Sequence, residues 1–275
     1  MSDSALTERE PEQGAVVGAI GALGAAVLDI VDEVKGIYSV FVRTLYYVWY
    51  GRSDRGAVVH QMYEIGNRSL FFICVVMGFF GCIVVFQTGI QAKRVVPDLT
   101  MLGAMYLELL VRDLAASIAS LMLATRVGAG IAAEIGSMVV TEQVDALRMC
   151  AADPIDFLVK PRMLASLMMS TAVIIVGGAV AAGSGALTAL SFFDVAPRTF
   201  FNLSLIDTGD VVVGLTKCVA YGTAIPVVSA YCGLSTFGGS EGVGWATTRA
   251  VVSSSLATII LNFFISGAGV ILFPA

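Results

Sequence analysis

The sequence predicts an all-α integral membrane protein, and three observations support that fold class. Hydrophobic residues make up 57% of the 275 residues and charged residues only 13%, against roughly 25% charged in an average soluble domain. The apolar residues form runs about as long as the roughly 20 residues that a helix needs to cross a bilayer. The runs are continuous rather than alternating, and every backbone amide in the bilayer must be paired without water, so helices are favoured over a β-barrel.

Five apolar runs define the expected transmembrane spans, at residues 69–91, 99–125, 164–193, 211–233 and 250–273. The second and third spans are joined by a long charged segment, residues 126–162. No internal repeat relates the spans, which disfavours a secondary transporter built from inverted repeats.

The residues before the first span are expected to lie outside the bilayer core. Residues 1–13 are polar and acidic, which predicts disorder and argues against a cleavable signal peptide. Residues 14–67 are interpreted as an interfacial amphipathic region, because Lys35 and Arg43 accompany a cluster of aromatic residues. A sixth span over residues 14–30 is the alternative, although its Gly, Ala and Val content gives a poor transfer free energy.

The distribution of basic residues predicts the orientation. With a cytoplasmic N-terminus, eleven of the 16 Lys and Arg residues lie inside and three, Lys93, Arg94 and Arg198, lie outside. The positive-inside rule therefore places the N-terminus in the cytoplasm and the C-terminus on the other side. The remaining two, Arg112 and Lys217, lie within spans.

Ionisable residues within the spans mark a polar cavity or a paired network, because charge in the bilayer is costly. Glu108 and Arg112 are four residues apart and could neutralise each other. Asp113 lies on a neighbouring face and needs its own partner, for which Lys217 in the fourth span is the available cation.

The second half of the segment 126–162 predicts a short amphipathic helix. Thr141 is a plausible N-cap, and Asp145 can pair with Arg148 three residues later. Asp153-Pro154 is expected to end this helix. One apolar stripe would consist of Val140, Val144, Leu147 and Ala151. An ordinary solvated loop is the alternative interpretation.

The same segment resembles a known family. The stretch from Ala124 to Met149, with Asp153-Pro154 and Pro161-Arg162 after it, closely resembles the signature of the MlaE (YrbE) family of ABC-transporter permeases. The stretch from Ala246 to Leu256 resembles the start of that family's last span. Residues 68–275 would then form the permease domain.

The resemblance implies a homodimer in the bacterial inner membrane, with a periplasmic C-terminus. It implies a separate cytoplasmic ATPase that binds ATP and Mg, a periplasmic MCE-domain partner, in some systems a STAS-domain subunit, and phospholipid or a related lipid as cargo moved between inner and outer membranes. This chain would hold no cofactor, bind no nucleic acid and catalyse no reaction; it has no G-x-x-x-x-G-K-[ST] phosphate loop. The short internal helix would be the coupling helix that enters the ATPase, with these contact residues: Glu134, Glu142, Gln143, Asp145, Leu147 and Arg148.

The resemblance also bears on the charged residues within the spans. The family commonly reads Arg-Glu-Leu-Gly-Pro where this chain reads Arg112-Asp-Leu-Ala-Ala, so the carboxylate is shorter and the Gly-Pro perturbation of the helix is missing. We expect Asp113 and Lys217 to line the lipid cavity, with Lys217 meeting a phosphate as a point charge. Gln87 would serve the cavity mouth, with interfacial solvation as its alternative.

Ionisable residues within the spans also occur in two other function classes. An intramembrane enzyme is disfavoured because the chain has no HExxH and a single histidine, His60. An ion-coupled carrier or channel with an Asp113/Lys217 relay is the main alternative. Dependence on ATP and on an ATPase partner distinguishes the permease from the carrier.

Overall fold

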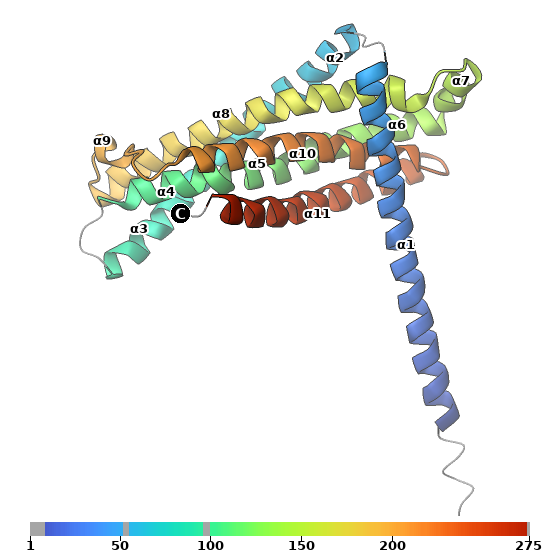
Figure 1. Cartoon of the computed structure of the whole chain (residues 1–275), viewed down its shortest axis with the longest axis horizontal. Coiled ribbons are helices and arrows are strands. Elements are labelled where there is room, and N and C mark those ends of the chain that lie inside the picture. The colour runs from blue at the N-terminus through green and yellow to red at the C-terminus, as the bar shows by residue number, and fades with distance from the viewer. Residues whose placement is uncertain (1–8, 52–54, 96–99, 274–275) are drawn as a thin grey trace, which may run out of the picture. The chain divides into compact units, whose positions relative to one another are not determined.

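The computed structural model describes residues 9–51, 55–95 and 100–273, and this part of the chain contains helices and no strand (Figure 1). It divides into two compact units, Met1–Arg43 and Thr44–Ala275. The α-helices are α1 Arg9–Tyr50, α2 Arg55–Met62, α3 Arg68–Val95, α4 Leu102–Leu109, α5 Ala115–Leu123, α6 Ala129–Val140, α7 Gln143–Met149, α8 Lys160–Phe193, α9 Pro197–Phe200, α10 Thr208–Leu234 and α11 Ser240–Leu272. Four π-helical turns interrupt them: η1 Tyr63–Asn67, η2 Leu110–Leu114, η3 Ala124–Gly128 and η4 Ile155–Val159.

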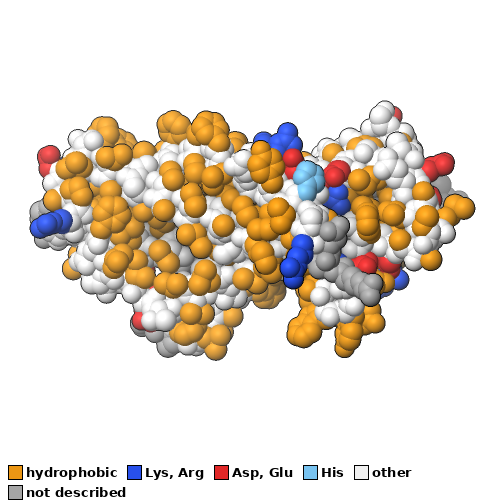
Figure 2. All heavy atoms as spheres, turned by 90° about the horizontal axis from the view of Figure 1, so that it is seen from above, with side chains coloured by type: hydrophobic (Ala, Val, Ile, Leu, Met, Phe, Trp, Pro, Cys, Tyr) orange, Lys and Arg blue, Asp and Glu red, His pale blue; other side chains and the backbone are white. Residues whose placement is uncertain are grey.

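Five helical stretches of the described residues are long and apolar enough to cross a membrane, which confirms the predicted five-span fold. They are Arg55–Arg94, Leu102–Val140, Ile155–Phe193, Thr208–Leu234 and Ser240–Leu272. Large apolar side chains such as Phe71 and Phe79 lie exposed along them, and Figure 2 shows hydrophobic side chains across much of the face that it draws. Exposed apolar surface of this extent is what a lipid solvent requires.

The second and third spans extend further than the apolar runs predicted. Residues 126–140, expected in the internal connection, continue the second helix to Val140 through η3 and α6, and the third helix already begins at Ile155. The apolar runs miss these extensions because charged residues such as Arg126 and Arg162 interrupt the runs while the helices continue through them. The internal connection is therefore short, with α7 as its only helix among the described residues.

Small residues of α8 lie where α8 packs against α3. Gly177, Ala181 and Gly185 are buried, and α3 packs along them. A Cβ on Gly177 would lie 3.2 Å from side-chain atoms of Ile73 and Met77 of α3. The glycines thus let the two helices approach closely, as the spacing of small residues predicts.

Helix α10 occupies the centre of the larger unit. It packs against α6, α8 and α11, and Figure 1 shows it running between α8 and α11. Over half of its most apolar window, 56%, is buried, against 11% for α11. Side chains of α10 are therefore enclosed by protein, whereas α11 presents most of its surface outward.

The N-terminal region differs in part from the prediction. Residues 1–8 lie outside the described residues, and α1 already begins at Arg9, within the segment expected to be disordered. Helix α1 is not among the stretches that could cross a membrane, so its interfacial position remains a prediction. At its C-terminal end, Tyr47 belongs to the larger unit and donates its hydroxyl to Oδ2 of Asp153 at 2.7 Å.

Candidate functional site

The centre of the candidate site is an ion pair between Lys217 and Asp113. Lys217 lies on α10 with a side chain that is 1% exposed, whereas the side chain of Asp113, in η2, is 34% exposed. Each charge compensates the other within the apolar spans, where an unpaired charge would be costly. The structure confirms the predicted contact between these two residues; their role toward lipid remains a prediction.

The second span has a π-helical turn, η2, at this point. A π-bulge alters the direction in which successive side chains leave a helix and is frequent at functional sites. Arg112 pairs with Asp210 of α10 at 3.2 Å, while the adjacent Asp113 reaches Lys217, about two helical turns further along α10. The helix is thus perturbed even though the Gly-Pro pair of the resembling family is missing.

The proposed pairing of Glu108 with Arg112 is wrong, because the Arg112 guanidinium turns to Asp210 instead. Asp210 is held for this contact at the start of α10. Its Oδ2 accepts the backbone N–H of Asp207 at 3.1 Å, as part of a capping box between Asp207 and Asp210. One carboxylate therefore caps a helix and neutralises a cation of the neighbouring span.

A glycine lets α10 approach the perturbed helix. A Cβ on Gly214 would lie 2.5 Å from the backbone carbonyl oxygen of Val111, a separation that ordinary side chains do not allow. Gly214 is less than one helical turn from Lys217. The short reach of the Asp113 carboxylate is compatible with the ion pair because the two backbones are this close.

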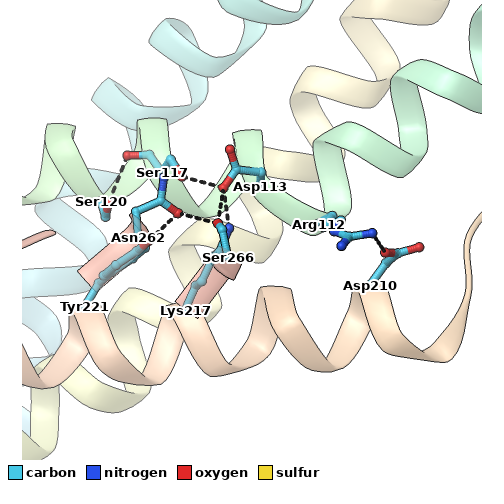
Figure 3. A network of polar contacts seen from close by, with 9 residues as sticks. All are labelled: Arg112, Asp113, Ser117, Ser120, Asp210, Lys217, Tyr221, Asn262 and Ser266. Carbon is cyan, nitrogen blue, oxygen red and sulfur yellow. Dashed lines mark hydrogen bonds and ion pairs between the residues drawn. The ribbon is translucent and has the colours of Figure 1, made fainter. Parts of the chain in front are cut away.

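Polar side chains of three helical stretches extend the ion pair into a network (Figure 3). Ser117 and Ser266 hydroxyls donate to Oδ1 of Asp113 at 3.3 and 3.4 Å. Asn262 Oδ1 accepts from the Ser266 hydroxyl at 3.4 Å and from the buried Tyr221 hydroxyl at 3.0 Å. The network joins the second span, α10 and α11, so a change in the charge of Asp113 reaches all three.

Sequence reasoning missed Asn262, Ser266 and Tyr221. Asn262 carries the one amide side chain in the apolar run 250–273, and a polar amide in a span is expected to seek a partner across helices. That signal was available in the sequence. Serine and tyrosine occur too often in membrane helices for a comparable signal.

An apolar hollow of about 400 Å³ lies between the second span, α8 and α10. Its lining includes Gly214 and Cys218 of α10, which flank Lys217 in the sequence, together with Val111, Ala115 and Gly178. Its size falls within the roughly 300–1,000 Å³ typical of small-molecule pockets. The apolar lining of this hollow suits an acyl chain, although neither Asp113 nor Lys217 lines it.

Helix α7 carries most of the predicted coupling residues, and it exposes them. Glu142, Gln143, Asp145 and Arg148 are exposed and Leu147 is half-buried. Asp145 and Arg148 form the predicted ion pair, at 3.0 Å. Helix α7 therefore offers a charged, accessible face at the turn between the second and third spans.

Two details of the α7 prediction are wrong. Thr141 does not cap α7; its hydroxyl donates to the carbonyl of Ser137 at 2.8 Å and so ends α6, while the residue before α7 is Glu142 in a left-handed conformation (φ 59°). Asp153 does not end α7 either. Its Oδ1 accepts the backbone N–H of Ile155 at 2.9 Å, which begins the third span.

The predicted apolar stripe is also only partly correct. Val144 is buried and Leu147 half-buried, but Ala151 is exposed with a φ of 57° and Val140 belongs to α6. The stripe fails because α7 spans only seven residues, so the spacing that assumed one continuous helix does not apply.

Glu134 lies apart from the other predicted coupling residues. It belongs to α6, and its carboxylate pairs at 2.8 Å with Arg162 of α8, whose side chain is 4% exposed. Arg162 also donates to the carbonyl of Leu158 at 2.6 Å. This ion pair links the second and third spans beside α7.

Gln87 lies exposed on α3 and makes none of the hydrogen bonds of the Asp113–Lys217 network. Its predicted place at a cavity mouth remains a prediction. Among the described residues, no group of three or more His, Cys, Asp or Glu side chains is placed to hold a metal ion.

Comparison with known proteins gives consistent matches over most of the chain. The family model described as Permease MlaE matches residues 58–268. A probable ABC transporter permease protein of Synechocystis sp. is 36% identical over 218 residues, covering 78% of this chain and 82% of that protein. The intermembrane phospholipid transport system permease protein MlaE of Haemophilus influenzae is 29% identical over 264 residues, covering 92% of this chain and 100% of that protein. The chloroplastic protein TRIGALACTOSYLDIACYLGLYCEROL 1 of Arabidopsis thaliana is 31% identical over 218 residues, covering 77% of this chain and 62% of that protein.

Proposed function

The chain belongs to the MlaE permease family, and on that premise we propose that it is the membrane subunit of an ATP-binding-cassette transporter that moves phospholipid between the inner and outer membranes. The observation that carries the proposal is the Asp113–Lys217 ion pair within apolar spans. The name of the Haemophilus relative, which is a phospholipid transport permease, supports phospholipid as the cargo.

The ion pair gives a phospholipid phosphate a specific partner. Lys217 is a buried point charge that already holds one oxyanion, the carboxylate of Asp113. A phosphate that enters the site replaces this carboxylate as the counter-ion, while the hydroxyls of Ser117 and Ser266 remain as hydrogen-bond donors for Asp113. The apolar hollow beside α10 offers space for an acyl chain. Exchange of partners avoids leaving Lys217 unpaired in a low-dielectric environment.

A separate ATPase supplies the energy in this proposal. We expect its groove to receive α7, whose charged face is exposed. Helix α7 lies between the second and third spans, and the Glu134–Arg162 ion pair links those two spans. Movement of α7 would therefore shift both spans together and alter access to the Asp113–Lys217 site.

The proposed assembly is a homodimer. Only 11% of the most apolar window of α11 is buried within the chain, and Phe263 and Phe264 are 77% and 65% exposed. A second copy packed on this helix would enclose Asn262 and Ser266 of the network. A periplasmic MCE-domain protein, and in some systems a STAS-domain subunit, would complete the complex.

The proposed location is the bacterial inner membrane, with a cytoplasmic N-terminus and a periplasmic C-terminus. The excess of basic residues on the side of the N-terminus supports this orientation. In this orientation α7 faces the cytoplasm, where an ATPase would meet it.

The coupling proposal is tested by exchanging the charges of α7. Asp145→Lys with Arg148→Glu keeps an ion pair within α7 but reverses the position of the two charges. An ATPase whose surface is complementary to the parent chain would then meet like charges at both positions. Opposed like charges at an interface cost several kcal/mol, so we expect copurification of the ATPase to fall by more than about tenfold.

The control variant is Asp32→Lys with Lys35→Glu. These residues form another exposed ion pair three residues apart, on α1, and we expect the ATPase to bind this variant like the parent. If the α7 variant retained the ATPase as well as the control did, α7 would not be the coupling helix.

A further inference from the structure

A second hollow, distinct from the Asp113–Lys217 site, lies between the first and second spans near their α7-side ends. Its volume is about 440 Å³. The residues of α2, η1 and α3 form one wall and those of η3 and α6 form the other. We call it the Arg126 hollow; its polar lining consists of His60, Gln61, Glu64, Arg68, Ser69, Arg126 and Glu134. Figure 2 shows basic, acidic and histidine side chains close together beside the broad hydrophobic surface.

The charged residues that line the Arg126 hollow are two arginines and two glutamates, and one of the arginines, Arg126, is left without an acidic partner among the described residues. The two glutamates are already neutralised, since Glu64 pairs with Arg68 at 2.5 Å and Glu134 pairs with Arg162 at 2.8 Å. Arg126 is exposed, and no acidic side chain of the described residues lies within ion-pair distance of it. One guanidinium, with its planar set of hydrogen-bond donors, is therefore available to an anion.

A buried hydroxyl in the same lining is an independent sign of a ligand. Ser69 is 0% exposed, and its Oγ has no hydrogen-bond partner among the described residues. A buried polar atom without a partner costs free energy unless a ligand or water satisfies it. A group with several acceptor oxygens would accept from both Ser69 and Arg126.

The surface that continues from the hollow is apolar, which indicates a lipid rather than a free ion. Phe72, Val75 and Phe79 follow Arg68 at intervals of four, seven and eleven residues, so they lie on one face of α3. Their side chains are 39%, 43% and 69% exposed. A charged hollow continued by an exposed apolar face along a span matches a phosphate headgroup with acyl chains beside it.

The depth of the hollow separates it from the Asp113–Lys217 site. Arg126 follows Asp113 by 13 residues in the sequence, which is about 20 Å along a helix axis. The hydrocarbon core is about 30 Å thick. The hollow therefore lies near the headgroups of the leaflet on the α7 side, while Asp113 lies far deeper.

We propose that the Arg126 hollow binds the phosphate group of a phospholipid in the leaflet on the α7 side, with Arg126 as the counter-ion and Ser69 as a hydrogen-bond donor. This binding site does not depend on the proposed transport function: the lipid is held there whether or not the chain moves lipid.

The test measures lipids retained by the purified full chain. The chain is taken from nanodiscs that contain phosphatidylglycerol and diacylglycerol in equal amounts, and native mass spectrometry counts each lipid bound after detergent exchange. We expect the parent to retain phosphatidylglycerol in preference to diacylglycerol, which lacks a phosphate. Loss of a charge-assisted hydrogen bond in Arg126→Gln should weaken this retention by about tenfold.

Two variants serve as controls, and a third tests Ser69. Arg198→Gln removes an exposed arginine of α9 and should retain phosphatidylglycerol like the parent. Arg126→Lys keeps the charge and should retain lipid nearly like the parent and more than Arg126→Gln, whose folding is checked separately by thermal unfolding. Ser69→Ala should weaken retention without altering the charge.

Three results would overturn the proposal. Equal retention by Arg126→Gln and Arg198→Gln would exclude Arg126 as the counter-ion. Displacement of the lipid by inorganic phosphate at the same concentration would identify a site for free phosphate. Unchanged lipid retention with loss of ATPase copurification in Arg126→Gln would assign this surface to the ATPase.

Discussion

Replacing Lys217 with methionine removes the buried cation and keeps a long, flexible side chain. Breaking a buried ion pair from one side costs about 3–5 kcal/mol, because the other charge is left unpaired. The side chain of Asp113 is 34% exposed, so water compensates part of this loss. We expect the free energy of unfolding to fall by about 2–3 kcal/mol, which lowers the ratio of folded to unfolded protein by about 100-fold.

Stability and lipid binding are separated by a second variant. Asp113→Asn with Lys217→Met removes both charges, so no unpaired charge remains and most of the lost stability should return. Neither variant has the cation for a phosphate, so both should retain less phospholipid at this site than the parent. Thermal unfolding in detergent measures stability, and mass spectrometry of retained lipid measures binding.

Two results would refute this reasoning. If Lys217→Met were as stable as the parent, the ion pair would contribute nothing to the fold. If the double variant recovered its stability and also moved phospholipid like the parent in the reconstituted complex, Lys217 would have no role toward the cargo.

Three further predictions follow from other parts of the chain. Gly214→Ala should destabilise the protein by about 1–3 kcal/mol, since its Cβ would lie 2.5 Å from a backbone carbonyl oxygen. Thermal unfolding measures this effect, and Gly183→Ala, whose Cβ would have nothing within 4 Å, is the matched control. Equal effects of the two substitutions would contradict the close approach of the helices at Gly214. Glu134→Gln should destabilise the protein more than Arg162→Gln. The glutamate substitution leaves the 4% exposed guanidinium of Arg162 unpaired, whereas the arginine substitution leaves the 48% exposed carboxylate of Glu134 unpaired. The reverse order of stability in thermal unfolding would contradict the burial of Arg162. Cys150, an exposed free cysteine next to α7, should react with a membrane-impermeant maleimide added from the cytoplasmic side and be protected by the ATPase; labelling from the periplasmic side would contradict the orientation.

The five spans could be predicted from the sequence because continuous apolar runs reflect the bilayer itself. The contact of Asp113 with Lys217 was predictable for a related reason. Few ionisable residues occur in the spans, and a charge there must find a partner of opposite sign. A small number of candidates therefore determines the pair.

Other features depend on packing that leaves no local signal. The π-turn η2 lies in a sequence, Leu110 to Leu114, that would also form a regular α-helix. Within this turn Arg112 pairs with Asp210 rather than with Glu108, so the simple spacing of four residues was misleading. The end of α6 at Thr141 was missed because a threonine can cap a helix at either end through its hydroxyl.

The most direct test of the proposed function is the movement of a labelled phospholipid by the complete complex reconstituted in vesicles. We predict that movement requires ATP and the ATPase subunit, continues when ion gradients are dissipated, and is lost in the Asp145→Lys, Arg148→Glu variant. Movement that follows an ion gradient without ATP would contradict the account and would favour an ion-coupled carrier with an Asp113/Lys217 relay.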